Sequence, residues 1–173
     1  MVFRIGWRDR ACMGRGCHVV YRGDNGACER VCTVAVKTEE IQVATQGNNH
    51  VIDITGDVAR AVGRSGLRDG VVTVFHVGST AGLTTTEFEP GLVEHDLEAA
   101  FEKIAPASGR YVHEQTWHDD NGHSHVRASL LGPSLSVPFV AGRLTLGTWQ
   151  QIILIDFDTR SRTRTVICQI VGE

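Results

Sequence analysis

The chain has 173 residues, and its 17 lysines and arginines nearly balance its 20 aspartates and glutamates, giving a formal net charge of -3. This length fits one domain that can bury a real core. The charge gives no electrostatic support for binding nucleic acid, and no apolar run approaches the roughly 20 residues that cross a bilayer. Because the N-terminus also lacks a signal-peptide core, we expect a cytoplasmic protein without nucleic-acid or membrane partners.

Residues 1–32 differ in composition from the rest of the chain. They have no sustained apolar period and hold four of the five cysteines, namely Cys12, Cys17, Cys28 and Cys32. Five is an odd number, so a complete disulfide framework is excluded, and the C-x4-C-x10-C-x3-C spacing lacks the tight C-x2-C pair of most structural zinc sites. We predict a poorly ordered or atypical extension over residues 1–32 and a single working domain over residues 33–173.

The first half of this domain alternates strands and helices. Alternating apolar residues predict strands at 32–37 and 40–44, and a short extended piece follows at 51–52. A helix begins at Thr55 and ends between Gly63 and Gly66. The β-branched run at 70–77 predicts a strand buried on both faces, with His76 inside it. Residues 83–88 resume extended structure with Glu87 as a candidate buried carboxylate, and Glu89-Pro90 opens the strongest helix, which ends near Ile104.

The second half is predicted to be mostly β-structure. Residues 110–117 resemble a strand, a helix runs from Ser124 to Gly132-Pro133, and further strands are predicted at 135–139, 143–146, 148–157 and 164–171. Residues 152–155 are apolar on both faces, so we expect a central strand that packs against a second sheet or a neighbouring subunit. The pattern predicts an α+β fold, a sandwich of mostly antiparallel strands with two main helices.

Residues 113–125 contain the densest group of side chains suited to metal, proton or phosphate chemistry. Four of the eight histidines fall here, close to two aspartates and one arginine: His113, His118, His123, His125, Asp119, Asp120 and Arg127. A helix starting at Ser124 would leave the N–H groups of Val126 and Arg127 free for an anion. If the helix starts earlier, His123 and His125 diverge by about 200°, and His113 becomes the partner of His125. The alternative is a polar surface turn with solvated histidines.

Several long motifs resemble the YjbQ-like family, whose members include proteins described as secondary thiamine-phosphate synthases. The resemblance covers residues 33–173, about four-fifths of the chain. It rests on four blocks: Gly78-Ser79-Thr80-Ala81 with Thr84-Thr85-Thr86-Glu87, the stretch 121–134, Gly142-Arg143-Leu144-x-Leu146-Gly147-Thr148-Trp149-Gln150, and the closing Gln169-Ile170-Val171-Gly172-Glu173.

This resemblance implies an α+β sandwich, a homotrimer and a histidine-lined site near subunit boundaries that takes zinc. His125 and His113 match family histidines. Many members have His-Thr-Thr-Ala where this chain has Gly78-Ser79-Thr80-Ala81, so a ligand position is glycine here. Either His76, His118 or His123 replaces it, or the metal is bound more weakly or not at all.

These residues are compatible with two functions. The first is a transferase that joins hydroxymethylpyrimidine diphosphate to thiazole phosphate. Glu87 and Arg127 would be catalytic, and Ser79, Thr80, Arg127, Ser129, Arg143, Thr148 and Gln150 would bind substrate or phosphate. His113, His123 and His125 would hold a divalent metal. Zinc is favoured because it prefers imidazole ligands, and magnesium would serve with a diphosphate substrate.

The second function is that of a zinc-binding trimeric hydrolase, with Glu87 or Asp119 as base, or of a protein that only binds a small phosphorylated molecule.

Overall fold

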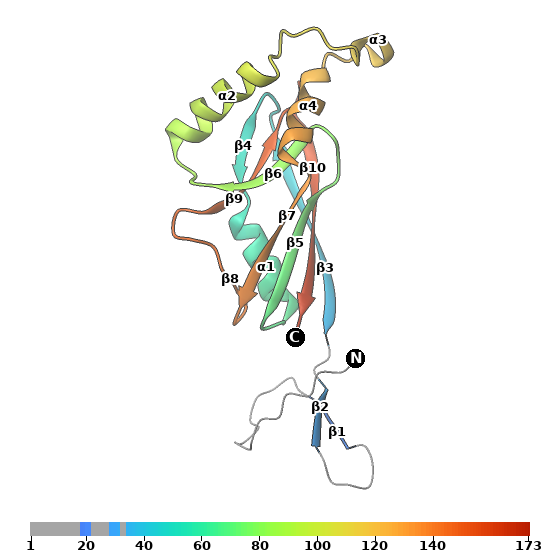
Figure 1. The fold of residues 1–173 in the computed structure, drawn as a ribbon, viewed down its shortest axis with the longest axis vertical. Coiled ribbons are helices and arrows are strands. Elements are labelled where there is room, and N and C mark those ends of the chain that lie inside the picture. The colour runs from blue at the N-terminus through green and yellow to red at the C-terminus, as the bar shows by residue number, and fades with distance from the viewer. Residues whose placement is uncertain (1–17, 22–27, 32–33) are drawn as a thin grey trace.

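The computed structural model describes residues 18–21, 28–31 and 34–173, which form two main sheets and a group of helices (Figure 1). Near the N-terminus β1 (His18–Tyr21) pairs antiparallel with β2 (Cys28–Val31). The remaining residues before 34 lie outside the described residues. The expected poorly ordered or atypical extension over residues 1–32 therefore falls on a part of the chain whose side chains are not described.

The larger sheet has five strands in the order β3-β10-β5-β7-β8, and each neighbouring pair is antiparallel. Its members are β3 (Ala35–Thr45), β5 (Gly70–His76), β7 (Ser134–Val140), β8 (Arg143–Leu144) and β10 (Arg162–Gly172). Two separate strands were predicted between residues 32 and 44. A single strand forms instead, because β3 pairs with β10 along its whole length, from Ala35 opposite Gly172 to Thr45 opposite Arg162.

The smaller sheet has the order β4-β9-β6 and consists of β4 (His50–Asp53), β6 (Ala81–Thr86) and β9 (Gln151–Asp156). Its central strand, β9, is buried on both faces, as the sequence predicted. Ile152 and Leu154 belong to the main core, whereas Ile153 and Ile155 pack with Phe157 against residues of α2 and α4. The doubly apolar strand is therefore covered within one chain and needs no neighbouring subunit.

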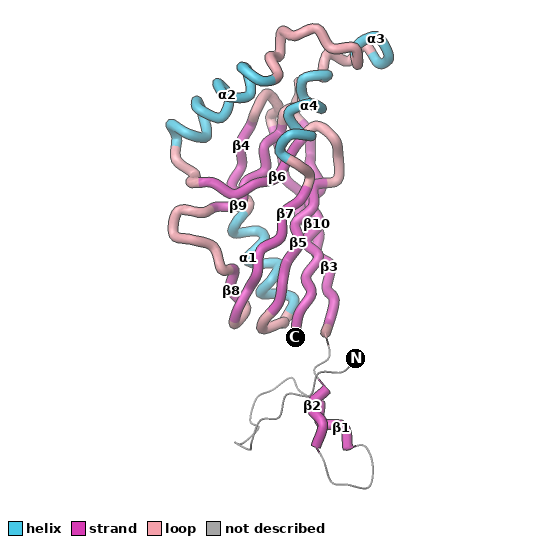
Figure 2. Tube along the Cα trace, viewed as in Figure 1, coloured by secondary structure: helices cyan, strands magenta, loops and turns pink. Residues whose placement is uncertain are grey.

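Within the described residues, four helical segments accompany the sheets: α1 (Thr55–Ser65), a π-helical turn η1 (Leu92–Asp96) that continues into α2 (Leu97–Ile104), α3 (Glu114–Trp117) and α4 (Gly122–Leu131). Figure 2 shows α2, α3 and α4 at one end of the molecule and α1 alongside the long strands. None of the helices in the described part is long and apolar enough to cross a membrane.

Two local predictions about the helices need correction. The expected strand at 110–117 is instead the short helix α3, which ends at His118 with a left-handed φ of 55°. Thr55 was expected to cap α1, but its Oγ1 accepts the N–H of Ile152 at 2.8 Å, and the carboxylate of Asp53 accepts the Thr55 N–H at 2.8 Å. The predicted apolar face of α1 is confirmed, because Val58, Ala61 and Val62 are buried in the core.

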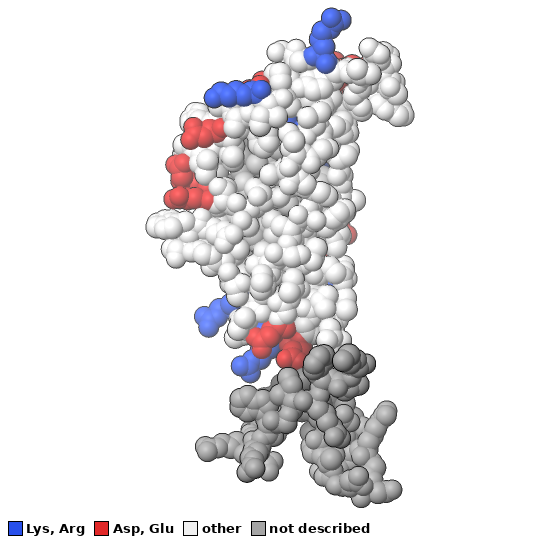
Figure 3. Space-filling model, viewed as in Figure 1, with Lys and Arg blue, Asp and Glu red and all other residues white. Residues whose placement is uncertain are grey.

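No helix or strand of the described part of the chain covers one face of the larger sheet. Residues that point inward from β3, β5 and β10 join α1 in the core, while their neighbours in sequence point outward. Among these outward side chains Val36, Val71 and Phe75 are 59%, 42% and 43% exposed. In the space-filling view, most of the surface over β5, β7 and β10 carries neither Lys or Arg nor Asp or Glu (Figure 3).

Candidate functional site

The start of α4 determines how the histidine-rich stretch is arranged. The helix begins at Gly122, two residues before the predicted start, because Glu114 caps it from α3. The Glu114 carboxylate accepts the N–H groups of Asp120 at 2.7 Å and Gly122 at 2.8 Å. The amides of Val126 and Arg127 therefore lie beyond the first turn of the helix, and the predicted anion site on them does not form. Ser124 caps nothing, and its hydroxyl donates to the Phe157 carbonyl at 2.6 Å.

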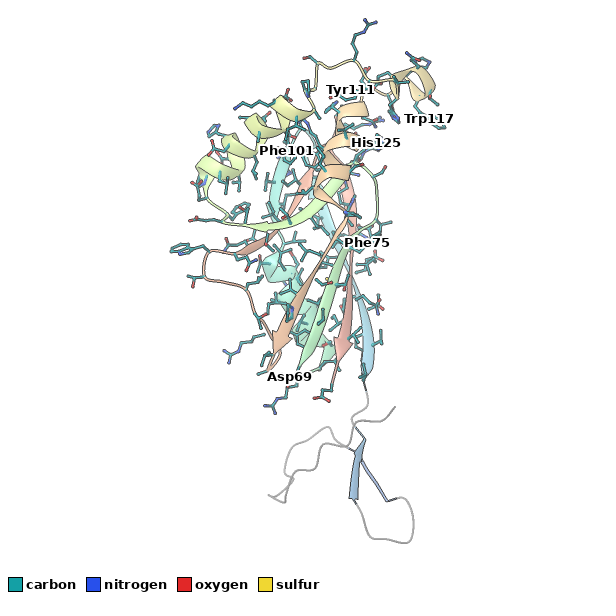
Figure 4. All side chains as sticks on the ribbon, viewed as in Figure 1. Asp69, Phe75, Phe101, Tyr111, Trp117 and His125 are labelled. Atoms are coloured by element: carbon teal, nitrogen blue, oxygen red, sulfur yellow. The ribbon has the colours of Figure 1, made fainter. Side chains whose placement is uncertain are left out.

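His125 on α4 lies against His113, which immediately precedes α3. Their ring centroids are 4.6 Å apart, with an angle of 55° between the ring planes. His113 Nε2 also lies 3.4 Å from Asp119 Oδ1. Both of these atoms are shielded from solvent, and neither has a hydrogen-bond partner among the groups described. The structure thus brings together two of the three predicted metal ligands and adds a carboxylate. Figure 4 shows His125 on α4, at the end of the molecule remote from Asp69.

His123, the third predicted ligand, lies elsewhere. Its side chain is buried, its ring centroid is 6.2 Å from that of Tyr111, and its Nε2 is 3.4 Å from the Ser124 hydroxyl. Burial, and then the nearby Arg127 charge, lower the pKa of His123, so its ring stays neutral. Within residues 34–173, no three His, Cys, Asp or Glu side chains already form a group that could hold a metal ion.

A small pocket of about 230 Å³ opens beside His125. It is lined by Gly78, Ser79, Ala81, His125, Ala128, Ser129 and Pro133. Ser129 Oγ donates to the His125 carbonyl at 2.7 Å, so its lone pairs stay available to accept a hydrogen bond. Two of the predicted phosphate-binding residues, Ser79 and Ser129, thus line the same pocket as His125.

The other predicted substrate residues do not line this pocket. Thr80 is buried and donates to Asp158 Oδ2 at 3.1 Å. Gln150 donates to the Thr85 hydroxyl at 2.9 Å and lines a separate cavity, while Arg143 and Thr148 are exposed. Glu87 follows the end of β6 and is exposed, so the expectation of a buried carboxylate was wrong.

Arg127, predicted to bind phosphate, is only 1% exposed and is engaged within the protein. Its Nε donates to the Ala105 carbonyl at 2.9 Å, one terminal nitrogen donates to Asn49 Oδ1 at 2.7 Å, and the other pairs with Glu102. These bonds join α4 to the end of α2 and to the β3–β4 loop. A phosphate could reach this guanidinium only by displacing those partners.

A buried ionic cluster that was not predicted from the sequence lies between the end of β9 and the start of β10. Arg164 donates to Asp156 Oδ2 at 2.8 Å and to the Thr80 hydroxyl at 3.0 Å, and Thr45 donates to the same aspartate. Burial opposes ionisation of Asp158, but hydrogen bonds, first from Arg162 at 3.0 Å, outweigh it and keep its pKa below the usual value. The sequence does contain a signal for this cluster, because Asp156 and Asp158 directly follow the buried run Ile152–Ile155. Carboxylates in such a place are buried only when they are paired with a cation.

Comparison with known proteins agrees with this fold. The family model described as UPF0047 protein YjbQ-like matches residues 39–173. A UPF0047 protein of Archaeoglobus fulgidus is 41% identical over 128 residues, which is 74% of this chain and 96% of that protein. A UPF0047 protein of Methanothermobacter thermautotrophicus is 36% identical over 80% of this chain and 94% of its own length.

Solved structures with a similar fold support the same family assignment. A protein of unknown function from Sulfolobus solfataricus superposes with a TM-score of 0.76 at 33% identity, covering 82% of this chain and 100% of that one. A hypothetical protein from Aeropyrum pernix gives 0.74 at 33% identity, covering 79% and 99%. With most of its length matched by the family model and by relatives above 30% identity, the chain belongs to the UPF0047 YjbQ-like family.

Proposed function

We propose that the pocket beside His125 binds a small phosphorylated substrate together with a divalent cation, and that the protein acts as a thiamine-phosphate synthase-like transferase in a secondary activity. The main supporting observation is the grouping of His113, His125 and Asp119 next to a pocket that also presents the hydroxyls of Ser79 and Ser129. The resemblance of the sequence motifs to family members described in this way supplies the choice of reaction.

One pair of donor atoms has the spacing of two zinc ligands. Two ligands of a tetrahedral zinc ion, each about 2.1 Å from it, lie about 3.4 Å apart. His113 Nε2 and Asp119 Oδ1 are separated by 3.4 Å and lack other partners among the described residues. His125 is the next donor, and a further ligand would come from the substrate or from a neighbouring subunit. A bound cation would stabilise negative charge on diphosphate oxygens, and magnesium would serve if these oxygens supplied most of the ligands.

In the proposed reaction the thiazole nitrogen forms a bond to the methylene carbon of the pyrimidine, and the bond from that carbon to diphosphate breaks with its electron pair. The protein then has to hold both reactants in line and stabilise the leaving diphosphate. Ser79 is suited to donate a hydrogen bond to a phosphate oxygen, whereas the Ser129 hydroxyl already donates to the His125 carbonyl and is left to accept one from the substrate. His113 and His125 provide imidazole nitrogens as ligands for the cation.

The test uses purified protein without a His-tag, assayed for diphosphate release with both precursors and with each alone. His125→Ala should lose at least 100-fold in rate and most of the bound zinc, whereas His95→Ala, an exposed histidine on η1, should keep both. Diphosphate release that needs no thiazole phosphate would support the hydrolase alternative. Equal zinc content and equal rates in wild type and His125→Ala would refute the proposed site.

We also propose that the uncovered face of the larger sheet joins subunits into a homotrimer. On this face the register places Val36, Val171 and Val71 side by side across three strands. Four residues further along β3 and β5, Glu40, Ile167 and Phe75 form a second such row. Between these rows the Thr38 hydroxyl donates a hydrogen bond to Gln169 Oε1 at 3.0 Å, so these polar groups are already partly satisfied.

A broad exposed surface with so little charge is typical of an interface. Light scattering should give a trimer, Phe75→Glu should give monomers, and a wild-type monomer at micromolar concentration would refute the assembly.

A further inference from the structure

His76 lies directly behind the wall of the pocket beside His125. It is the last residue of β5 and points inward, with 0% exposure, on the same face as Val72 and Val74. Its backbone N–H donates to the Pro133 carbonyl at 2.8 Å, and Pro133 lines the pocket. Gly78 and Ala81, two further lining residues, also lie next to the His76 ring.

The imidazole of His76 is buried without hydrogen bonds. Neither Nδ1 nor Nε2 has a partner of acceptable geometry among the described groups. Burial, and then the Arg164 charge, lower the pKa of this ring, against the opposing effects of Asp156 and of a contact with the Ala81 backbone that falls short of good hydrogen-bond geometry. The ring is therefore neutral, with one N–H and one free lone pair. A buried polar group without partners lowers stability, and an apolar side chain of similar size would avoid that loss.

Gly78 lies between the His76 ring and the pocket, and it has no side chain there. A Cβ atom at position 78 would lie 2.6 Å from His76 Cε1 and 3.1 Å from Nε2, closer than packed atoms approach. The ring edge that carries Nε2 therefore faces the glycine, and any other residue at position 78 would push the ring away. The ring therefore fills the space beside Gly78, and its nitrogens are shielded from solvent, so a molecule in the pocket reaches Nε2 only when the Gly78 backbone shifts.

We propose that His76 is a recognition residue of this pocket, and that its Nε2 accepts a hydrogen bond from a hydroxyl or amino group of the small molecule bound there. The inference rests on the proposed function in taking that molecule to be the substrate. A neutral nitrogen lone pair attracts a donor rather than a phosphate oxygen, so His76 contacts the organic part of the substrate. Phosphate oxygens are bound by Ser79 and by the cation that His113 and His125 would hold.

The test separates binding from stability with His76→Leu, which removes both ring nitrogens. The melting temperature should rise by about 2–6 °C, because an unpaired polar ring leaves the core. Affinity for hydroxymethylpyrimidine diphosphate, which has an amino group, should fall about 10-fold or more in calorimetry, while affinity for inorganic diphosphate should not change. Val74→Ala on the same strand face is the matched control and should lower the melting temperature without changing either affinity.

Gly78→Ala provides a second variant, since its Cβ displaces the His76 ring and should weaken binding of the pyrimidine diphosphate as His76→Leu does. A drop in melting temperature for His76→Leu, or pyrimidine affinity equal to wild type, would overturn the inference by showing a structural histidine. If wild-type protein binds neither compound, the proposed function fails. The role of His76 is then judged by the melting temperature alone, where a rise supports it and a fall refutes it.

Discussion

Replacing Arg127 by alanine distinguishes a structural role for this residue from the catalytic role that the sequence suggested. The substitution removes the donors to the Ala105 carbonyl and to Asn49 Oδ1, together with the ion pair to Glu102. The carbonyl of Ala105, a residue that is 2% exposed, would lose its partner at a cost of about 1–3 kcal/mol, and the bond to Asn49 contributes about 1.5 kcal/mol. The Glu102 side chain is 40% exposed, so this ion pair adds at most about 1 kcal/mol after solvent screening.

These contributions predict a loss of about 3–5 kcal/mol in the free energy of unfolding, and a melting temperature about 6–20 °C lower. Urea unfolding and thermal melting measure both quantities. Arg64→Ala is the control, because Arg64 is exposed and pairs with Glu39 at 2.8 Å, so its loss should cost less than about 1 kcal/mol. An Arg127→Ala protein with wild-type stability but without diphosphate binding would refute the structural role and restore the residue to the phosphate site.

Three further predictions follow from buried or capping groups. Burial and Arg164 lower the pKa of His76, while Asp156 opposes them, so only the unfolded chain takes up a proton below the usual pKa of about 6.5. The free energy of unfolding should therefore fall by up to about 1.4 kcal/mol per pH unit as the pH drops from 6.5 towards the folded-state pKa. His76→Leu should flatten this slope in urea titrations at several pH values. A slope equal to that of the wild type would contradict the proposed burial of a neutral His76. Burial raises the pKa of the Cys168 thiol to about 11, so iodoacetamide at pH 8 should label Cys168 only after unfolding, and native labelling detected by mass spectrometry would count against a closed core. Glu114→Ala should cost about 1–2 kcal/mol in urea unfolding by removing the acceptor at the start of α4, and a cost no larger than that of Glu94→Ala on exposed η1 would show that the cap contributes little.

Periodicity predicted the strands and helices that are controlled by their own burial pattern. The face of α1, the long helix that ends near Ile104 and the doubly buried run Ile152–Ile155 all have enough apolar residues at one spacing to determine their structure. Residues 110–117 have a strand-like composition but no neighbouring strand to pair with, and they form the short helix α3. A strand needs a partner that lies far away in sequence, so composition alone could not decide this segment.

The candidate site was harder to predict because the same residue types serve binding and structure. Arg127 and Thr80 had the chemistry of phosphate ligands, yet the structure uses them to join α2 with α4 and to satisfy Asp158. Asp156 and Arg164 were overlooked because a charge at the end of a strand normally lies in solvent. Burial separates these roles, and burial of a single polar side chain depends on contacts between distant segments.

The histidines show how one capping contact decides which residues can act together. Glu114 begins α4 at Gly122, so His123 and His125 both lie on the helix, where residues two apart point in directions about 200° apart. The earlier helix start was the condition under which His113 was expected to become the partner of His125, and the observed 4.6 Å between their rings agrees with that expectation. His123 turns towards Tyr111 and Arg127 and becomes part of the interior. Only a helix start at or after His125 was expected to let His123 and His125 face one ion, so the residue that selects the candidate ligands, Glu114, is not itself one of them.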